Sequence, residues 1–115
     1  MMSLTINNVD QLQQYLDGVS GRATHHAPNV NEVILALAGA VVLFKDPDTQ
    51  LEVRTYRGAP ANVLFLTING TRYVLTYNHQ QQSVDIKRNS VRGQVVGSFT
   101  NATSPRQILQ IFQAL

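Results

Sequence analysis

Apolar residues recur at helical spacing near the start of the chain. The pattern follows Asn8, a residue type that caps helices, and Gln11 stands three residues further on, as in a capping box. The apolar stripe itself consists of Val9, Leu12, Leu16 and Val19. This spacing predicts a helix that ends near Gly18, followed by a polar link over residues 20–28.

A second helix is expected to open at Asn29, with Glu32 in the matching capping position. Residues 33–44 are apolar on every side, which is typical of a helix buried between other elements. Gly39 lies in the middle of this segment and is placed to end the helix. We favour a helix to that glycine and a strand over residues 41–44, with a continuous helix as the alternative.

Between residues 51 and 99 the pattern changes to a period of two, which is typical of strands with one buried face. Strands are expected at residues 51–57, 63–68, 71–77, 84–88 and 94–99. Asn69 and Gly70 lie between two of them and form the strongest short signal of a hairpin, because both turn positions need a positive φ. Such a turn places Phe65 opposite Val74.

The C-terminal segment has a clear helix start. Ser104 is a cap, Pro105 fits the first helical position, and Gln107 completes a capping box. The apolar face that follows consists of Ile108, Leu109, Ile111, Phe112 and Leu115. The expected order is two helices, an antiparallel meander of five or six strands, and a C-terminal helix. With the helices on one side of the sheet, this is an α+β fold in a single domain over residues 1–115.

Composition narrows the class of protein. The sequence is 43% hydrophobic, and its 115 residues are enough to bury a core without disulfides or a bound metal. Cysteine is absent, which excludes disulfides, thiolate zinc sites and a cysteine nucleophile.

The longest apolar run, residues 33–44, is shorter than the roughly 20 residues of a membrane-spanning helix. The start of the chain lacks the pattern of a signal peptide. We therefore expect a cytoplasmic protein that does not contact membranes.

Residues with catalytic or metal-binding chemistry are few. His25 and His26 fall in the predicted polar link, where adjacent side chains point in opposite directions, and His79 falls in a distant loop. A metal site or an acid/base pair would need a carboxylate brought close by folding. Motifs for phosphate binding or for a serine nucleophile are absent. We expect no cofactor and no metal, and we favour a protein that is not an enzyme.

Positive charge is concentrated in the second half of the chain. Residues 1–49 contain two basic and five acidic residues, whereas residues 50–115 contain seven basic and two acidic residues. Arginines on a sheet can bind nucleic acid or another polyanion. The candidate contacts are Arg54, Arg57, Arg72, Lys87, Arg88 and Arg92. The simpler interpretation is that these side chains point from strands into water.

The hairpin also predicts self-association. One of its faces is expected to join the core, and the other has an apolar centre with Thr67, Thr76 and Arg72 around it. An exposed face of an antiparallel sheet is normally polar, so an apolar centre favours the interface of a homodimer. The predicted interface consists of Val63, Phe65 and Val74. The alternative is that a helix or a curl of the sheet covers this face within one chain.

Three functional hypotheses remain. The leading one is a non-catalytic binding or interaction module whose ligand is a protein or a small molecule, for example one held between the sheet and the helices. This hypothesis follows from the lack of a recognisable set of catalytic residues in the sequence. The second is nucleic-acid or polyanion binding through the basic half of the chain. The third is a small enzyme whose site joins one of the histidines to a distant carboxylate.

Overall fold

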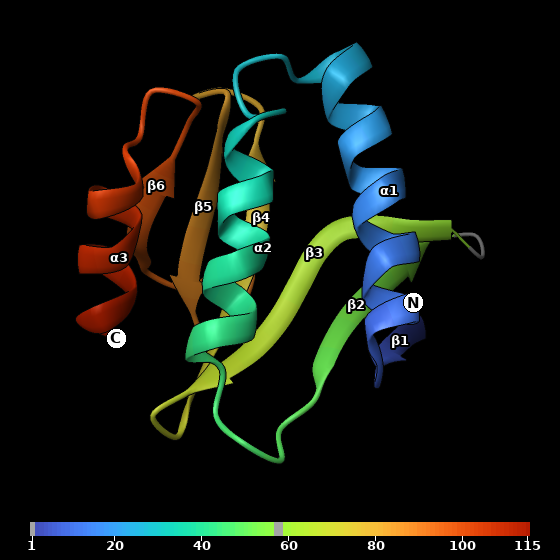
Figure 1. Cartoon of the computed structure of the whole chain (residues 1–115), viewed down its shortest axis with the longest axis vertical. Helices are drawn as coiled ribbons and strands as arrows, with labels where there is room; N and C mark the ends of the chain where they lie inside the picture. Colours follow the sequence, from blue (N-terminus) through green and yellow to red (C-terminus); the bar gives the residue numbers. More distant parts are fainter. Residues whose placement is uncertain (1, 57–58) are drawn as a thin grey trace.

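The computed structural model describes residues 2–56 and 59–115, and in that part of the chain it contains three helices and one six-stranded sheet (Figure 1). The elements are β1 (Met2–Ile6), α1 (Val9–His26), α2 (Val33–Phe44), β2 (Leu51–Tyr56), β3 (Ala59–Ile68), β4 (Thr71–Asn78), β5 (Ser83–Arg88), β6 (Val95–Phe99) and α3 (Pro105–Gln113). The strands lie in the order β1-β2-β3-β4-β5-β6, and each pairs antiparallel with its neighbours. The helices lie on one face of the sheet. The predicted α+β fold with an antiparallel meander is confirmed.

Strand β1 was not predicted. Its five residues pair with β2, with Leu4 opposite Val53, and it forms one edge of the sheet. A strand this short carries too little pattern to be distinguished from an irregular terminus, and it is held by its pairing with a segment about 50 residues away in the sequence. The sheet therefore begins before the first helix.

The central hairpin has the predicted register. Phe65 pairs with Val74 and Ile68 pairs with Thr71 across the turn. Asn69 and Gly70 have φ values of 50° and 77°, as the two-residue turn requires. The face toward the helices carries the buried residues Leu64, Leu66, Ile68, Tyr73 and Leu75.

Helix α1 is longer than predicted. It continues through Gly18 to His26, where the backbone N–H of Ala27 donates to the oxygen of Ala23 at 2.8 Å. A glycine inside a helix costs about 0.5–1 kcal/mol relative to alanine, which packing elsewhere can offset. Here Ala23 and Ala27 are both buried in the core. The prediction of a polar link over residues 20–28 was therefore wrong for most of its length.

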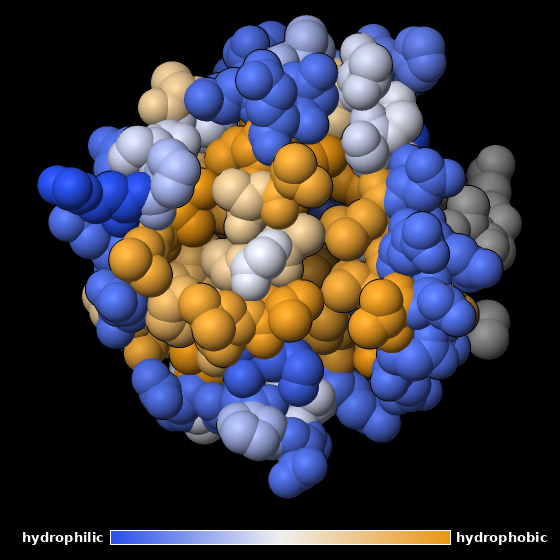
Figure 2. All heavy atoms as spheres, in the orientation of Figure 1, coloured by the Kyte–Doolittle hydropathy of each residue, from blue (hydrophilic) through white to orange (hydrophobic). Residues whose placement is uncertain are grey.

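Helix α2 extends over the whole apolar segment, so the predicted strand at residues 41–44 was wrong. The helical period buries Val41, which is 2% exposed, and leaves Leu43 72% exposed. The expectation that α2 is buried on every side was also wrong, since Leu35 is 81% exposed. Figure 2 shows hydrophobic residues gathered on this side of the molecule. The capping box expected at Asn29 is absent, because α2 begins at Val33.

Helix α3 begins as predicted. The backbone N–H of Gln107 donates to Ser104 Oγ at 3.1 Å, and Gln107 Oε1 accepts from the Ser104 N–H at 2.8 Å. The helix packs against β6 and α2 through Phe112, whose ring lies 5.9 Å from Phe99 and 5.7 Å from Phe44 between centroids. Within residues 2–56 and 59–115, no helix has the length and apolar character needed to cross a bilayer.

Candidate ligand-binding site

A cavity of about 350 Å³ lies between α1, α2 and the sheet. It exists because α1 packs loosely: of the residues in α1, only Ala23 is buried, whereas α2 buries four. The apolar stripe of α1 therefore faces the cavity instead of closing onto the core. Its volume lies in the range of roughly 300–1,000 Å³ that is typical of small-molecule sites.

The walls of this cavity are mainly hydrophobic. Each of the three structural units contributes: α1 supplies Leu12 and Leu16, α2 supplies Ile34 and Leu37, and the sheet supplies Leu64 and Leu75. Hydrophobic side chains that border a cavity keep part of their surface out of contact with other atoms. A molecule with an apolar body can fill this space and remove that surface from water.

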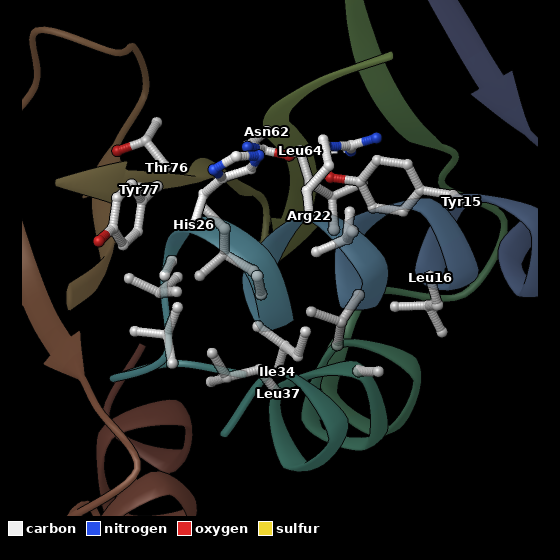
Figure 3. A pocket seen from close by; sticks show the side chains of 18 of the residues that line it. Tyr15, Leu16, Arg22, His26, Ile34, Leu37, Asn62, Leu64, Thr76 and Tyr77 are labelled. Carbon is white, nitrogen blue, oxygen red and sulfur yellow. Dashed lines mark hydrogen bonds between the residues drawn. The ribbon is translucent and has the colours of Figure 1, made fainter. Parts of the chain in front are cut away.

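Polar side chains gather where α1 faces β3 and β4 (Figure 3). Arg22 reaches from α1 to β3, where its Nη2 and Nε donate to Asn62 Oδ1 at 2.9 and 3.2 Å. Tyr15 stands two turns before Arg22 on the same side of α1, and Figure 3 shows its hydroxyl directed toward the interior of the site. His26 and Asn62 also line the cavity and are labelled in the same view. The cavity therefore joins an apolar body to one polar side.

The electrostatics of this polar side come from Arg22. The residues that line the cavity include no Asp or Glu, and among described residues Arg22 forms no ion pair. Burial raises the pKa of Tyr15 to about 12, although the charge of Arg22 acts in the opposite direction. The Tyr15 hydroxyl is therefore protonated at neutral pH and available as a hydrogen-bond donor.

Folding brings two of the three histidines to the cavity. His26, from the last turn of α1, and His79, from the connection after β4, both line it. His79 packs edge-to-face on Tyr77, with 4.7 Å between ring centroids. His25 is exposed and is not among the lining residues. Within the described residues no cluster of His, Asp and Glu could hold a metal ion.

The predicted anion contacts do not form one surface. Arg54, Arg72 and Lys87 lie on the face of the sheet opposite the helices, which we call the outer face, whereas Arg88 pairs with the core residue Tyr73. Arg92 is exposed in the turn between β5 and β6. Arg57 lies outside the described residues. The basic half of the sequence is thus divided between separate regions.

The outer face is covered by its own charged side chains. The Arg54 and Arg72 guanidinium carbons lie 5.0 and 4.2 Å from the centroid of the Phe65 ring, within the distance of cation–π contact. Arg72 also forms an ion pair with Glu52, with 3.4 Å between Nη2 and Oε2. Phe65 is 5% exposed and Val74 has no exposed surface.

The arginine side chains over Phe65 weaken the argument for self-association through this face. The apolar centre predicted from Val63, Phe65 and Val74 is largely closed within one chain, with only Val63 half-buried. The Arg54 and Arg72 guanidinium groups lie over the Phe65 ring and contribute to this closure. The homodimer stays a prediction.

The sequence contained one signal for this site that was not recognised. Tyr15 and Arg22 continue the apolar stripe of α1 at helical spacing, so a tyrosine and an arginine lie on its inward face. An arginine in such a stripe is unusual and indicates a polar position inside. The expected helix end at Gly18 separated Arg22 from the stripe and hid this signal.

Residues 12–110 match the protein family described as Integron cassette protein VCH_CASS1 chain. The matched segment begins in α1 and ends in α3, so it includes the α1–α2 connection, the central strands and the whole cavity. Among curated proteins, none matches this chain.

Proposed function

The chain belongs to the family described as Integron cassette protein VCH_CASS1 chain, and we propose that it is a binding protein for a small molecule with an apolar body. The site is the cavity between α1, α2 and the sheet. The observation that carries the proposal is the open, hydrophobic interior of about 350 Å³ beside a helix that is only loosely packed.

Packing energetics support this proposal. Protein interiors are close-packed, and voids larger than a water molecule are few. Here Leu12, Leu16 and Ile34 line the cavity and are only partly buried. An apolar ligand that covers them contributes about 25 cal/mol for each Å² of surface removed from water. Ligand binding therefore supplies burial that the chain alone leaves incomplete.

The lining residues favour binding over catalysis. General acid–base chemistry usually joins a histidine to a carboxylate that orients it and adjusts its pKa. His26 and His79 reach the cavity, but none of the described residues that line it is acidic. The most buried carboxylate, Asp85, lies on the outer face, where it binds Ser83 and Ser98. This supports the non-catalytic module ahead of the small enzyme.

The proposal is tested by binding of the uncharged fluorescent probe N-phenyl-1-naphthylamine to two tryptophan variants of α2. Ala38 lines the cavity, so Ala38→Trp fills it and is expected to abolish the fluorescence increase. Ala36 is exposed on the same helix, so Ala36→Trp is the matched control and is expected to bind the probe as the wild type does. Far-UV circular dichroism confirms that each variant is folded.

Two results contradict the proposal. The first is a folded wild type that does not bind the probe at micromolar concentration. The second is equal probe binding by Ala38→Trp and by the wild type, which would place the probe on the exposed apolar side of α2 instead of in the cavity.

A further inference from the structure

We infer that the ligand is a monocarboxylate, and that Arg22 binds its carboxylate while its apolar body occupies the cavity. This inference rests on the proposed function and adds the chemical class of the ligand. It follows from three features of the polar side: a guanidinium held in place by a neutral partner, the Tyr15 hydroxyl on the same side of α1, and the lack of an acidic residue among the described lining residues.

The guanidinium of Arg22 is held in position by neighbours that leave its charge unneutralised. Asn62 Oδ1 accepts from Nε and Nη2, and the amide carries no charge. A side-chain carbon at Gly18 would lie 3.1 Å from Nη1, so the glycine provides the space in which the guanidinium lies along α1. Among the described residues the guanidinium donates to Asn62 alone, so its remaining N–H groups can bind a further acceptor. Asn62 therefore positions the arginine without replacing a ligand.

An arginine without a counter-charge beside a hydrophobic cavity favours an anion. When a ligand displaces water from the cavity, a neutral head group leaves the guanidinium partly desolvated without compensation, which is costly. A carboxylate restores that interaction through charge-assisted hydrogen bonds, and its planar geometry fits the fork of a guanidinium. Tyr15 adds a neutral donor from the same helix.

The size of the charge selects a carboxylate over a phosphate monoester. Among the described residues that line the cavity, Arg22 is the only Lys or Arg. A phosphate monoester carries close to two negative charges at neutral pH and three acceptor oxygens, and it is usually bound by several cationic groups. The Arg22 guanidinium and the Tyr15 phenol, which lie on the same side of α1, match a head group with a single charge and two oxygens.

The test compares decanoate with 1-decanol, which share an apolar chain and differ in the head group. Both are titrated by displacement of N-phenyl-1-naphthylamine from the wild type at pH 7.5. We expect decanoate to bind about tenfold more tightly or better, as charge-assisted hydrogen bonds imply. Arg22→Gln, which keeps a donor for Asn62, is expected to lose that preference and to bind 1-decanol as before.

Two further variants complete the design. Arg106→Gln removes an exposed arginine of α3 that does not line the cavity, and it is expected to leave both affinities unchanged. Arg22→Lys retains the charge and is expected to keep part of the preference for decanoate. Should Arg22→Gln fail to fold, the comparison of the two ligands on the wild type and on Arg22→Lys still decides.

The outcomes separate the two proposals. Equal affinity of the wild type for decanoate and 1-decanol overturns the carboxylate inference and leaves the binding function standing. A preference for decanoate that survives in folded Arg22→Gln overturns the role of Arg22. If the probe itself does not bind, the proposed function fails as well. If the probe binds and neither compound displaces it, the carboxylate inference fails.

Discussion

The Oδ1 atom of Asn101 accepts a hydrogen bond of 2.9 Å from the backbone N–H of Val33, 68 residues earlier in the chain. The same oxygen accepts from the N–H of Glu32 at 2.9 Å, and the Asn101 amide donates to the backbone oxygen of Pro28. Helix α2 has no side-chain cap of its own. The connection between β6 and α3 therefore supplies the N-cap that α2 lacks, on the helix that forms one wall of the cavity.

Removing this remote cap is expected to destabilise the protein. Asn101→Ala leaves two backbone N–H groups without their acceptor, and the free energy of unfolding should fall by about 1–2 kcal/mol, as for other lost N-caps. The Asn101 amide also donates to Glu32 Oε2 at 3.2 Å, so the matched control is Asn101→Asp in a Glu32→Gln background, which keeps the acceptor without opposing two carboxylates and should lose less stability. Urea denaturation measures both. Equal stability of Asn101→Ala and the wild type would mean that the cap does not contribute.

The hairpin turn gives a second prediction. Gly70 has a φ of 77°, and its N–H and that of Asn69 donate to the carboxylate of Asp46 at 2.8 and 2.6 Å. Gly70→Val is expected to lower the free energy of unfolding by about 1 kcal/mol or more, because a β-branched residue is strained at positive φ. Gly70→Asn is the control, since asparagine tolerates this region. An unchanged melting temperature for Gly70→Val contradicts the turn.

A pair of alanine substitutions tests the helical phase of α2. Val41 is buried and Leu43 is exposed, although a strand would place both on one face. Val41→Ala should cost about 1–3 kcal/mol through the lost packing, whereas Leu43→Ala should stay within about 0.5 kcal/mol of the wild type. Thermal unfolding distinguishes the two. Similar losses for both variants would favour the strand.

The environment of the Asp85 carboxyl predicts how the free energy of unfolding depends on pH. Burial alone raises the pKa of this carboxyl, but hydrogen bonds from Asn78, Ser98 and Ser83 and the charge of Lys87 outweigh it and lower the pKa below the usual 3.8. Because the folded-state pKa lies below the unfolded-state value, the stabilisation is complete above the latter and is lost as the pH falls through the former.

Asp85→Asn provides the comparison. At neutral pH this variant should be less stable than the wild type by about 1–3 kcal/mol, because two serine hydroxyls lose a charged acceptor. Below about pH 5, and down through the lowered folded-state pKa of Asp85, the free energy of unfolding should fall more steeply for the wild type than for the variant. Parallel pH profiles for the two proteins would show that Asp85 does not contribute to acid sensitivity.

The sequence by itself determined the elements whose interactions are local. The capping box of α3 joins Ser104 to Gln107, three residues apart, and the Asn69–Gly70 turn sets the hairpin register through its own backbone conformation. Interactions over such short separations involve few alternative partners, so residue types and spacing were sufficient to predict them. The α+β class followed from the same local signals taken in order.

The tertiary structure decided whatever depends on distant partners. Val33 begins α2 because Asn101 caps it, α1 passes Gly18 because Ala23 and Ala27 are buried beyond it, and arginines cover Phe65. The cavity between α1, α2 and the sheet belongs to this group, since Arg22 and Asn62 meet across 40 residues of sequence. Packing and burial outweigh the small local preferences at these positions, and the space that α1 leaves unfilled exists only once the sheet has formed.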